Sequence, residues 1–229
     1  MREILGERRT NGDGDGHGEE RRQDDARRRA ALRYATHWGW PVLPGAGAGP
    51  DGLCDCARTG CPVPGAHPDD PALLAATTDP AMVRWWWTTR PGAPVILATG
   101  GRAPCALSLP ALAGARAVAA CERLGVALGP VAATPTRWLL LVEPYGLPEL
   151  GELLADQEHV PSSLRFHSSG GYVPLPPSRI GAGGVWWARE PGAPRGGDRP
   201  PWLPRVGEVL DILVDAGLTA PDQGSRLAY

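Results

Sequence analysis

Residues 77–98 read TTDPAMVRWWWTTRPGAPVILA, and this stretch decides the fold class. A Thr or Asp79 can cap a helix, Pro80 suits its first turn, and Pro91 ends it. The residues predicted on its apolar face are Met82, Val83 and Trp86. Residues 94–98 are continuously apolar and predict a buried strand directly after the helix. A helix followed at once by a buried strand indicates a domain that contains both kinds of element.

The flanking sequence extends this alternation. A helix is predicted from Asp25 to about Gly39, with Ala31, Leu32, Ala35 and Trp38 at helical spacing. The other predicted elements are strands at 40–44, 105–109 and 183–190, helices at 110–125, 147–157 and 205–218, and β-hairpins at 129–146 and 164–178. The face predicted to be apolar in the 110–125 helix holds Leu112, Ala115, Val118, Ala119 and Leu124. Helices and strands alternate without regular βαβ repetition, which favours the α+β class.

Composition limits the function. All 23 basic side chains are Arg, against 25 acids, and the chain after residue 33 carries 14 Arg against 17 acids. Strong, autonomous DNA binding usually needs a basic stripe, so at most a local Arg cleft is expected. The sequence has no long apolar run and no apolar leader, which predicts a cytoplasmic protein without membrane contact. The expected organisation is a disordered charged arm (1–24), one domain (25–190), a Pro/Gly linker (191–203), and a C-terminal amphipathic helix and tail (204–229).

Four metal-ligating residues lie within one Gly- and Pro-rich loop. Cys54, Cys56, Cys61 and His67 follow the spacing Cys-x-Cys-x4-Cys-x5-His. Three thiolates and one imidazole suit a closed, tetrahedral zinc site, so structural zinc is the expected cofactor. The spacing departs from paired Cys-x2-Cys, and free thiols in a tight loop are the alternative. Cys105 and Cys121 lie in apolar surroundings and are expected to fill the core.

Several ordered segments together resemble a known family. They are ALRYATHWGW (31–40), PVLP (41–44), the Cys-rich loop ending in PGAHP (64–68), TTDPAMVRWWW (77–87), VILATGG (95–101) and GGYVPLPPS (170–178). The succession is similar to the bifunctional DNA primase/polymerase (prim-pol) N-terminal domain of actinobacterial and phage-like proteins, over residues 28–190. The resemblance implies an archaeo-eukaryotic primase fold, with an RRM-like mixed sheet flanked by helices, and a role in DNA replication.

The resemblance also implies catalytic groups that this chain lacks. The family supplies an Asp-x-Asp pair on the strand after the ATG turn, a His after a small-residue run and a further acid on a later strand, and its active members use divalent metal ions. The first position falls near 106–110 (ALSLP), and no acid lies between Asp79 and Glu122. No His lies between His67 and His159, and no acid between Glu158 and Glu190. We therefore expect no catalytic residues of the family type, no Mg²⁺ or Mn²⁺, and a pseudoenzyme kept for binding or regulation.

Nucleotide binding is expected at the turn formed by Thr99, Gly100, Gly101 and Arg102, where backbone N–H groups and a guanidinium can face a phosphate. Arg84 and Arg137 are further candidates for the cleft. The expected partners are nucleotide or DNA, bound weakly, and a replication protein of plasmid or phage type. Two alternatives stay open: an active primase/polymerase that uses other acids, with Glu122 and Glu143 as candidates, and a protein-interaction scaffold.

Overall fold

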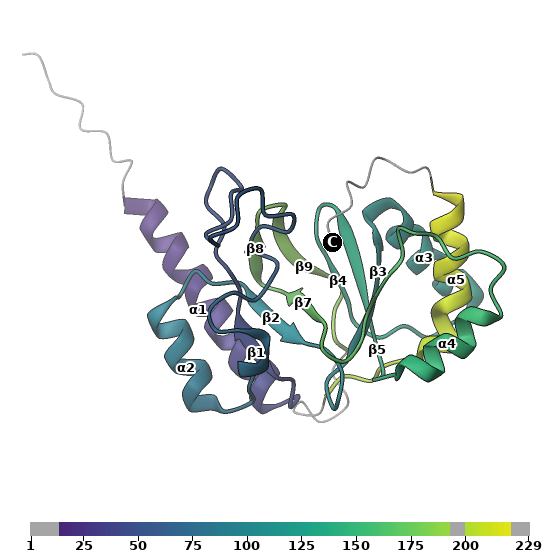
Figure 1. Cartoon of the computed structure of the whole chain (residues 1–229). Helices are drawn as coiled ribbons and strands as arrows, with labels where there is room; N and C mark the ends of the chain where they lie inside the picture. The colour runs from purple at the N-terminus through teal and green to yellow at the C-terminus, as the bar shows by residue number, and fades with distance from the viewer. Residues whose placement is uncertain (1–13, 193–199, 221–229) are drawn as a thin grey trace, which may run out of the picture.

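The computed structural model describes residues 14–192 and 200–220. Two antiparallel sheets lie between two groups of helices, with α1 and α2 beside the smaller sheet and α3, α4 and α5 beside the larger one (Figure 1). The helices are α1 (Gly14–Thr36), α2 (Pro80–Thr89), α3 (Ala111–Leu124), α4 (Leu147–Ala155), α5 (Val206–Thr219) and the short 3-10 turn η1 (Leu73–Ala75). The strands are β1 (Val42–Pro44), β2 (Val95–Ala98), β3 (Cys105–Pro110), β4 (Val131–Ala133), β5 (Arg137–Val142), β6 (Arg165–His167), β7 (Tyr172–Leu175), β8 (Ser178–Ile180) and β9 (Gly183–Arg189).

The larger sheet contains an RRM-like unit. The chain runs β3-α3-β4-β5-α4-β6, and its four strands stand in the order β6-β3-β5-β4, which is the βαββαβ arrangement. Strands β9 and β8 extend the sheet beyond β4, and the smaller sheet has the order β1-β2-β7. The expected α+β class is confirmed. The sequence suggested a mixed sheet, whereas all pairings between these strands are antiparallel.

The two faces of the larger sheet bury different cores. One core joins α1, α2 and the smaller sheet to Ala106, Leu139 and Leu141 of the larger sheet. The other core lies between the opposite face, which includes Leu107 and Leu140, and the helices α3, α4 and α5. Both Cys105 and Cys121 are fully buried in this second core, as the sequence predicted. Helix α5 therefore packs on the domain and completes its second core.

Two local expectations were wrong in part. Helix α1 begins at Gly14, so the segment 14–24 of the expected disordered arm is helical, while residues 1–13 lie outside the described residues. In α2, Val83 and Trp86 are buried as expected, but Met82 is exposed and Trp87 takes its place in the core. The expected 191–203 linker also lies partly outside the described residues, at 193–199, as does the tail at 221–229.

Helix α3 buries a different face from the one predicted. Its buried residues are the small ones, Ala113, Gly114, Ala117 and Cys121, while Leu112 and Leu124 are exposed. The reason is close packing against β5, since a Cβ on Gly114 would lie 2.5 Å from Cβ of Trp138. Large side chains on that face would push the helix off the sheet.

The predicted hairpin at 164–178 does not form. Strand β6 pairs with β3 of the larger sheet, whereas β7 pairs with β2 of the smaller one. The turn between them therefore carries the chain from one sheet to the other. The hairpin predicted at 129–146 is confirmed as β4 and β5. No helix among the described residues is both long and apolar enough to cross a bilayer.

Candidate functional site

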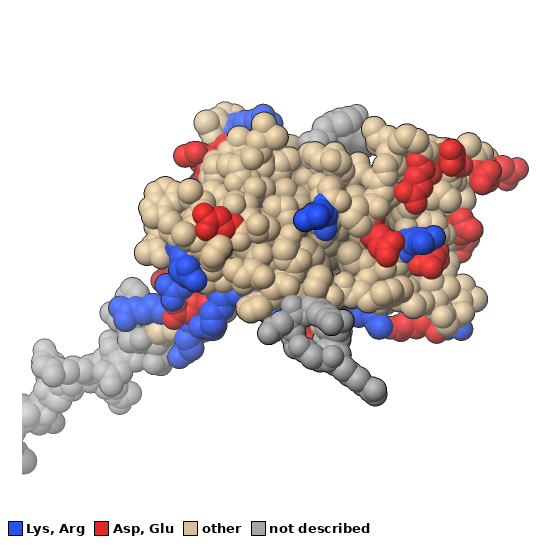
Figure 2. Space-filling model, turned by 90° about the horizontal axis from the view of Figure 1, so that it is seen from below, with Lys and Arg blue, Asp and Glu red and all other residues tan. Residues whose placement is uncertain are grey.

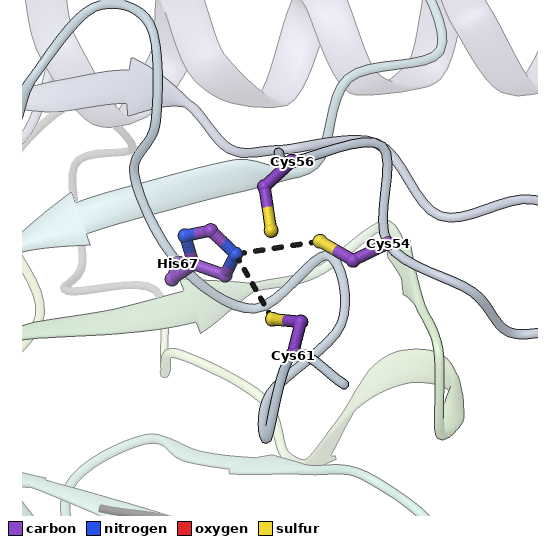
Figure 3. Close-up of side chains that lie close together, drawn as sticks. All are labelled: Cys54, Cys56, Cys61 and His67. Atoms are coloured by element: carbon purple, nitrogen blue, oxygen red, sulfur yellow. Dashed lines mark hydrogen bonds between the residues drawn. The ribbon is translucent and has the colours of Figure 1, made fainter. Parts of the chain in front are cut away.

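The four ligands predicted in the loop between β1 and α2 converge. The Sγ atoms of Cys54, Cys56 and Cys61 and a ring nitrogen of His67 all lie within 4.8 Å of one another and point toward a common centre (Figure 3). The Cys54 Sγ to His67 Nε2 distance is 3.3 Å, and Cys61 Sγ lies 3.4 Å from the same nitrogen. Bond lengths of about 2.3 Å to sulfur and about 2.0 Å to nitrogen place tetrahedral zinc ligands about 3.5 Å apart. The cluster could therefore hold a zinc ion with little rearrangement.

The groups around the cluster prepare it for a metal. The Nδ1 atom of His67 lies 2.6 Å from the carbonyl oxygen of Pro68. A carbonyl only accepts hydrogen bonds, so Nδ1 carries the proton and Nε2 presents its lone pair to the thiols. The backbone N–H of Gly65 donates to Cys54 Sγ over 3.4 Å, which favours a thiolate. These contacts are typical of the outer shell of a structural zinc site.

The thiols respond unequally to this environment. Burial opposes ionisation of Cys54, but hydrogen bonds from the backbone of Cys56 and Gly65 and from His67 outweigh it and lower the pKa of Cys54 to about 7. Burial and the neighbouring Cys54 raise the pKa of Cys61 to about 11. One thiolate is therefore favoured, and a second is opposed until a cation joins the cluster.

Backbone contacts position the loop against both sheets. The N–H of Ala46 donates to the carbonyl of His67 at 2.9 Å, directly after β1. The N–H of Gly181, in the turn between β8 and β9, donates to the carbonyl of Pro64 at 2.8 Å. The cluster thus closes a loop that bridges the smaller sheet and the edge of the larger one.

A second polar cluster lies on the face of the larger sheet that turns toward the smaller one. Ser108 of β3 is fully buried, and the strand register sets it opposite Arg165 of β6. Side chains at alternate positions share a face, so His167 of β6 and Arg137 of β5 lie on the same side. These three neighbouring strands thus bring together a serine, a histidine and two arginines. This is the place where the resemblance expects the family's first acidic pair.

Hydrogen bonds within the cluster have a fixed direction. Arg137 donates from Nε and Nη2 to Ser108 Oγ, at 3.3 and 3.1 Å, and from Nη2 to the carbonyls of Ser108 and Ser163, at 2.7 and 2.8 Å. A guanidinium cannot accept, so the hydroxyl of Ser108 is free to donate to Nε2 of His167 at 3.0 Å. The imidazole is therefore a hydrogen-bond acceptor at Nε2.

The electrostatics of this cluster are cationic. Burial, followed by the charges of Arg137 and Arg165, lowers the pKa of His167 to about 4, so the ring is neutral near pH 7. Burial and Arg165 lower the pKa of Arg137 to about 10, which leaves it charged. A neutral imidazole with a pKa this low is a poor general base, and the serine that it contacts is sealed from solvent. The geometry therefore argues against nucleophilic chemistry at Ser108.

The turn predicted to bind nucleotides, Thr99 to Arg102, lies beside the Ser108 cluster, but some of its polar groups already make hydrogen bonds within the protein. The N–H of Thr99 donates to Gly171, its hydroxyl donates to Ser168 at 2.6 Å, and the N–H of Gly100 donates to Pro104. Arg102 is exposed and lines an open groove of about 750 Å³ together with residues from the end of α1 and the start of α2. Of the four predicted nucleotide-binding residues, Arg102 thus has an exposed side chain that lines this groove.

The carboxylates of Glu122 and Glu143, the alternative candidates for metal binding, do not reach the Ser108 cluster. Glu122 lies on α3, which packs on the opposite face of the sheet, and its partner is Arg189 at 4.0 Å. Glu143 follows the far end of β5 and lies 3.8 Å from Arg205. Six residues of strand separate Glu143 from Arg137, which corresponds to about 20 Å. Neither carboxylate can bind a metal ion at Ser108.

The contacts of Ser108 with His167 and Arg137 could not be found from sequence spacing, because 59 and 29 residues separate the partners. No local pattern marks a side chain that meets its partner only through strand pairing.

Comparison with known proteins agrees with the fold and with the resemblance. The family model for the bifunctional DNA primase/polymerase N-terminal domain matches residues 31–206. No curated protein and no solved structure matches the chain significantly. Since the family model spans well over half of the sequence, the chain belongs to the family of bifunctional DNA primase/polymerase N-terminal domains.

Proposed function

We propose that this domain binds nucleotides or nucleic acid without transferring nucleotides by a two-metal mechanism. The observation that supports this proposal is the cluster at Ser108. Arg137 directs its guanidinium to the strand position where the family resemblance expects metal-binding carboxylates. Strands β3, β5 and β6 carry no Asp or Glu. A hard divalent cation needs oxygen ligands with negative charge, whereas this site offers a hydroxyl beside a fixed positive charge.

Binding in this proposal depends on local arginines. On the face shown in Figure 2, acidic side chains gather at the end formed by α4 and α5, and the central surface is mostly uncharged. A broad basic surface, which would give strong binding through many phosphates, does not cover this face. Weak binding at Arg102 and at the Ser108 cluster fits this distribution of charge. The expected place of action is the cytoplasm, where nucleotides and DNA are available.

A primer-extension assay tests the catalytic half of the proposal. The purified protein is given a primed template and labelled nucleotide, first with Mg²⁺ and then with Mn²⁺, beside a boiled control. An active primase/polymerase with its Asp pair intact, assayed in parallel, shows that the conditions support the reaction. We expect no incorporation, because losing metal-binding carboxylates removes many factors of ten in rate. Incorporation that copurifies with the protein would contradict the proposal, and Glu122 and Glu143 would be the first residues to replace.

We also propose that the Cys54, Cys56, Cys61 and His67 cluster holds a structural zinc ion. Protein purified without chelator should contain about one equivalent of zinc by elemental analysis, and Cys56→Ser should remove the zinc and lower the thermal midpoint. Cys121→Ala is the matched control, because it removes a buried thiol of the second core, outside the Cys-rich loop, and should keep the zinc. A metal-free wild-type protein whose stability zinc does not change would show that the thiols are bystanders.

A further inference from the structure

Two thiols of the Cys54, Cys56, Cys61 and His67 cluster lie near solvent. Cys54 and Cys61 are half-exposed, whereas Cys56 is only 9% exposed. The loop residues 58–60, which directly precede Cys61, are all exposed. A small oxidant can therefore reach two of the three sulfur atoms.

The two accessible sulfur atoms also lie close to each other. The Sγ atoms of Cys54 and Cys61 lie 3.3 and 3.4 Å from the same atom, Nε2 of His67, and all ligand atoms of the cluster lie within 4.8 Å of one another (Figure 3). Rotation of the two Cys side chains can shorten the S–S distance to the bond length of about 2.05 Å. A disulfide between Cys54 and Cys56 would span a single residue, where the backbone restricts the dihedral angle that the bond needs. Cys54 and Cys61 are thus the pair placed to couple.

We propose that hydrogen peroxide oxidises Cys54 and Cys61 to a disulfide and that this bond expels the zinc ion from the loop. The inference rests on the proposed zinc site, since a zinc-bound cysteine is ionised and the thiolate is the form that reacts with peroxide. The disulfide removes two of the four ligands, and Cys56 and His67 alone cannot complete a tetrahedral zinc site. The cluster is thus a thiol switch: its reduced form holds the metal and its oxidised form does not.

The reaction balances with one molecule of peroxide. The first thiolate attacks a peroxide oxygen, so the O–O bond breaks, a sulfenic acid forms and hydroxide leaves. The second thiolate attacks the sulfenic sulfur, so the S–S bond forms and a second hydroxide leaves. Two electrons pass from the sulfur atoms to the peroxide. Two protons from solvent convert both hydroxide ions to water.

Loss of the metal also loosens the contact between the loop and the β8–β9 turn. The N–H of Gly181 donates to the carbonyl of Pro64 at 2.8 Å, and a Cβ on Gly181 would lie 2.5 Å from Cβ of Pro64. Pro64 lies between Cys61 and His67, so a metal ion bound by both residues fixes the segment that makes this contact. The redox state of the thiols therefore controls how firmly the loop joins the two sheets.

Zinc release under hydrogen peroxide tests the inference on the full chain. The freed zinc is measured with a chromogenic chelator, and the thiols are mapped by alkylation and mass spectrometry. We expect about one equivalent of zinc to leave as the Cys54–Cys61 disulfide forms. Dithiothreitol with added zinc should restore the starting state. The core thiols of Cys105 and Cys121 are internal controls and should stay reduced, because both side chains are fully buried.

Two variants with two Cys and two His ligands identify the pair. Cys61→His should keep zinc, because two Cys and two His form a common structural zinc site, but it cannot form the Cys54–Cys61 disulfide. It should release zinc at least about tenfold more slowly than the wild type. Cys56→His is the matched control, because it has the same kinds of ligand, keeps the reactive pair and should release zinc as the wild type does. The disulfide map of the wild type decides the pairing if either variant fails to bind zinc.

The outcomes separate the inference from the zinc proposal. A protein that contains no zinc, and binds none when zinc is added, overturns both. A zinc-loaded protein that keeps its metal under peroxide overturns the inference alone. Zinc release through sulfinic acids, or through a disulfide that involves Cys56, also overturns the inference alone.

Hydrogen exchange tests the structural consequence. The Gly181 amide should exchange faster after oxidation. The Leu141 amide, which donates to the carbonyl of Pro130 at 3.0 Å in the larger sheet, is the control and should not change. Equal exchange of the Gly181 amide in the reduced and oxidised proteins overturns the release of the loop from the β8–β9 turn.

Discussion

Acidification should destabilise the protein through His167. Its ring is neutral in the folded state, with a pKa of about 4, because burial and the charges of Arg137 and Arg165 oppose protonation. In the unfolded chain a His titrates near pH ~6.5. Between these values the unfolded state binds the extra proton, so stability is fully present above pH ~6.5 and falls as the pH drops toward 4. From pH 7 to pH 5 this difference amounts to about 2 kcal/mol.

The assay is urea unfolding followed by tryptophan fluorescence at pH 7 and pH 5. His167→Gln removes the titrating ring and keeps an oxygen that can accept the hydrogen bond from Ser108. His159→Gln, at an exposed position, is the matched control. The wild type and the control should each lose about 2 kcal/mol more than His167→Gln between the two pH values. Equal losses in all three proteins would refute the reasoning, since His167 would then titrate alike in both states.

Two further predictions concern the surroundings of the Ser108 cluster. Gly100→Ala should lower the free energy of unfolding by at least about 3 kcal/mol, because φ of Gly100 is 90° and a Cβ would lie 2.4 Å from Cα of Ser169. A Cβ on Gly101 meets nothing within 4 Å, so Gly101→Ala should lower it by only about 1 kcal/mol for the positive φ. Equal urea midpoints for the two variants would contradict this account of the turn. Ser108→Asp should form an ion pair with Arg137 and bind no Mn²⁺ by calorimetry, whereas adding Arg137→Met should release the carboxylate for the metal. Equal Mn²⁺ affinity in the single and double variants would show that Arg137 does not block the position.

Local signals predicted the elements well where short-range physics decides them. Asp79 caps α2 by accepting from the N–H of Ala81 at 2.8 Å, and Gly125 ends α3 with a φ of 70°, both as the sequence indicated. The pairing of strands depends on distant partners instead. The Ser-Gly turn at 168–171 carries the same residues as a hairpin turn, but Thr99 donates to it and helps to draw β7 into the smaller sheet.

The two candidate sites differ in the same way. The spacing of Cys54, Cys56, Cys61 and His67 predicted the metal cluster because one short loop supplies all four ligands. The Ser108 cluster draws on three strands, so only the missing acids, and not the contacts that replace them, could be read from the sequence. Close packing against β5 likewise determines that α3 buries its small residues. The distance between α3 and β5 cannot be inferred from the periodicity of one helix.

The position of β7 determines the order in which the domain can be completed during synthesis. Strand β2 stands between β1 and β7, and β7 follows all four strands of the RRM-like unit in the chain. A nascent chain can therefore assemble β3 to β6 while β1 and β2, made earlier, still lack their third strand. The apolar face of α2, with Trp86 and Trp87, therefore packs on an incomplete smaller sheet until residue 175 has left the ribosome. The smaller sheet is completed by β7 and the second core by α5, so each half of the domain depends on a segment that is translated late.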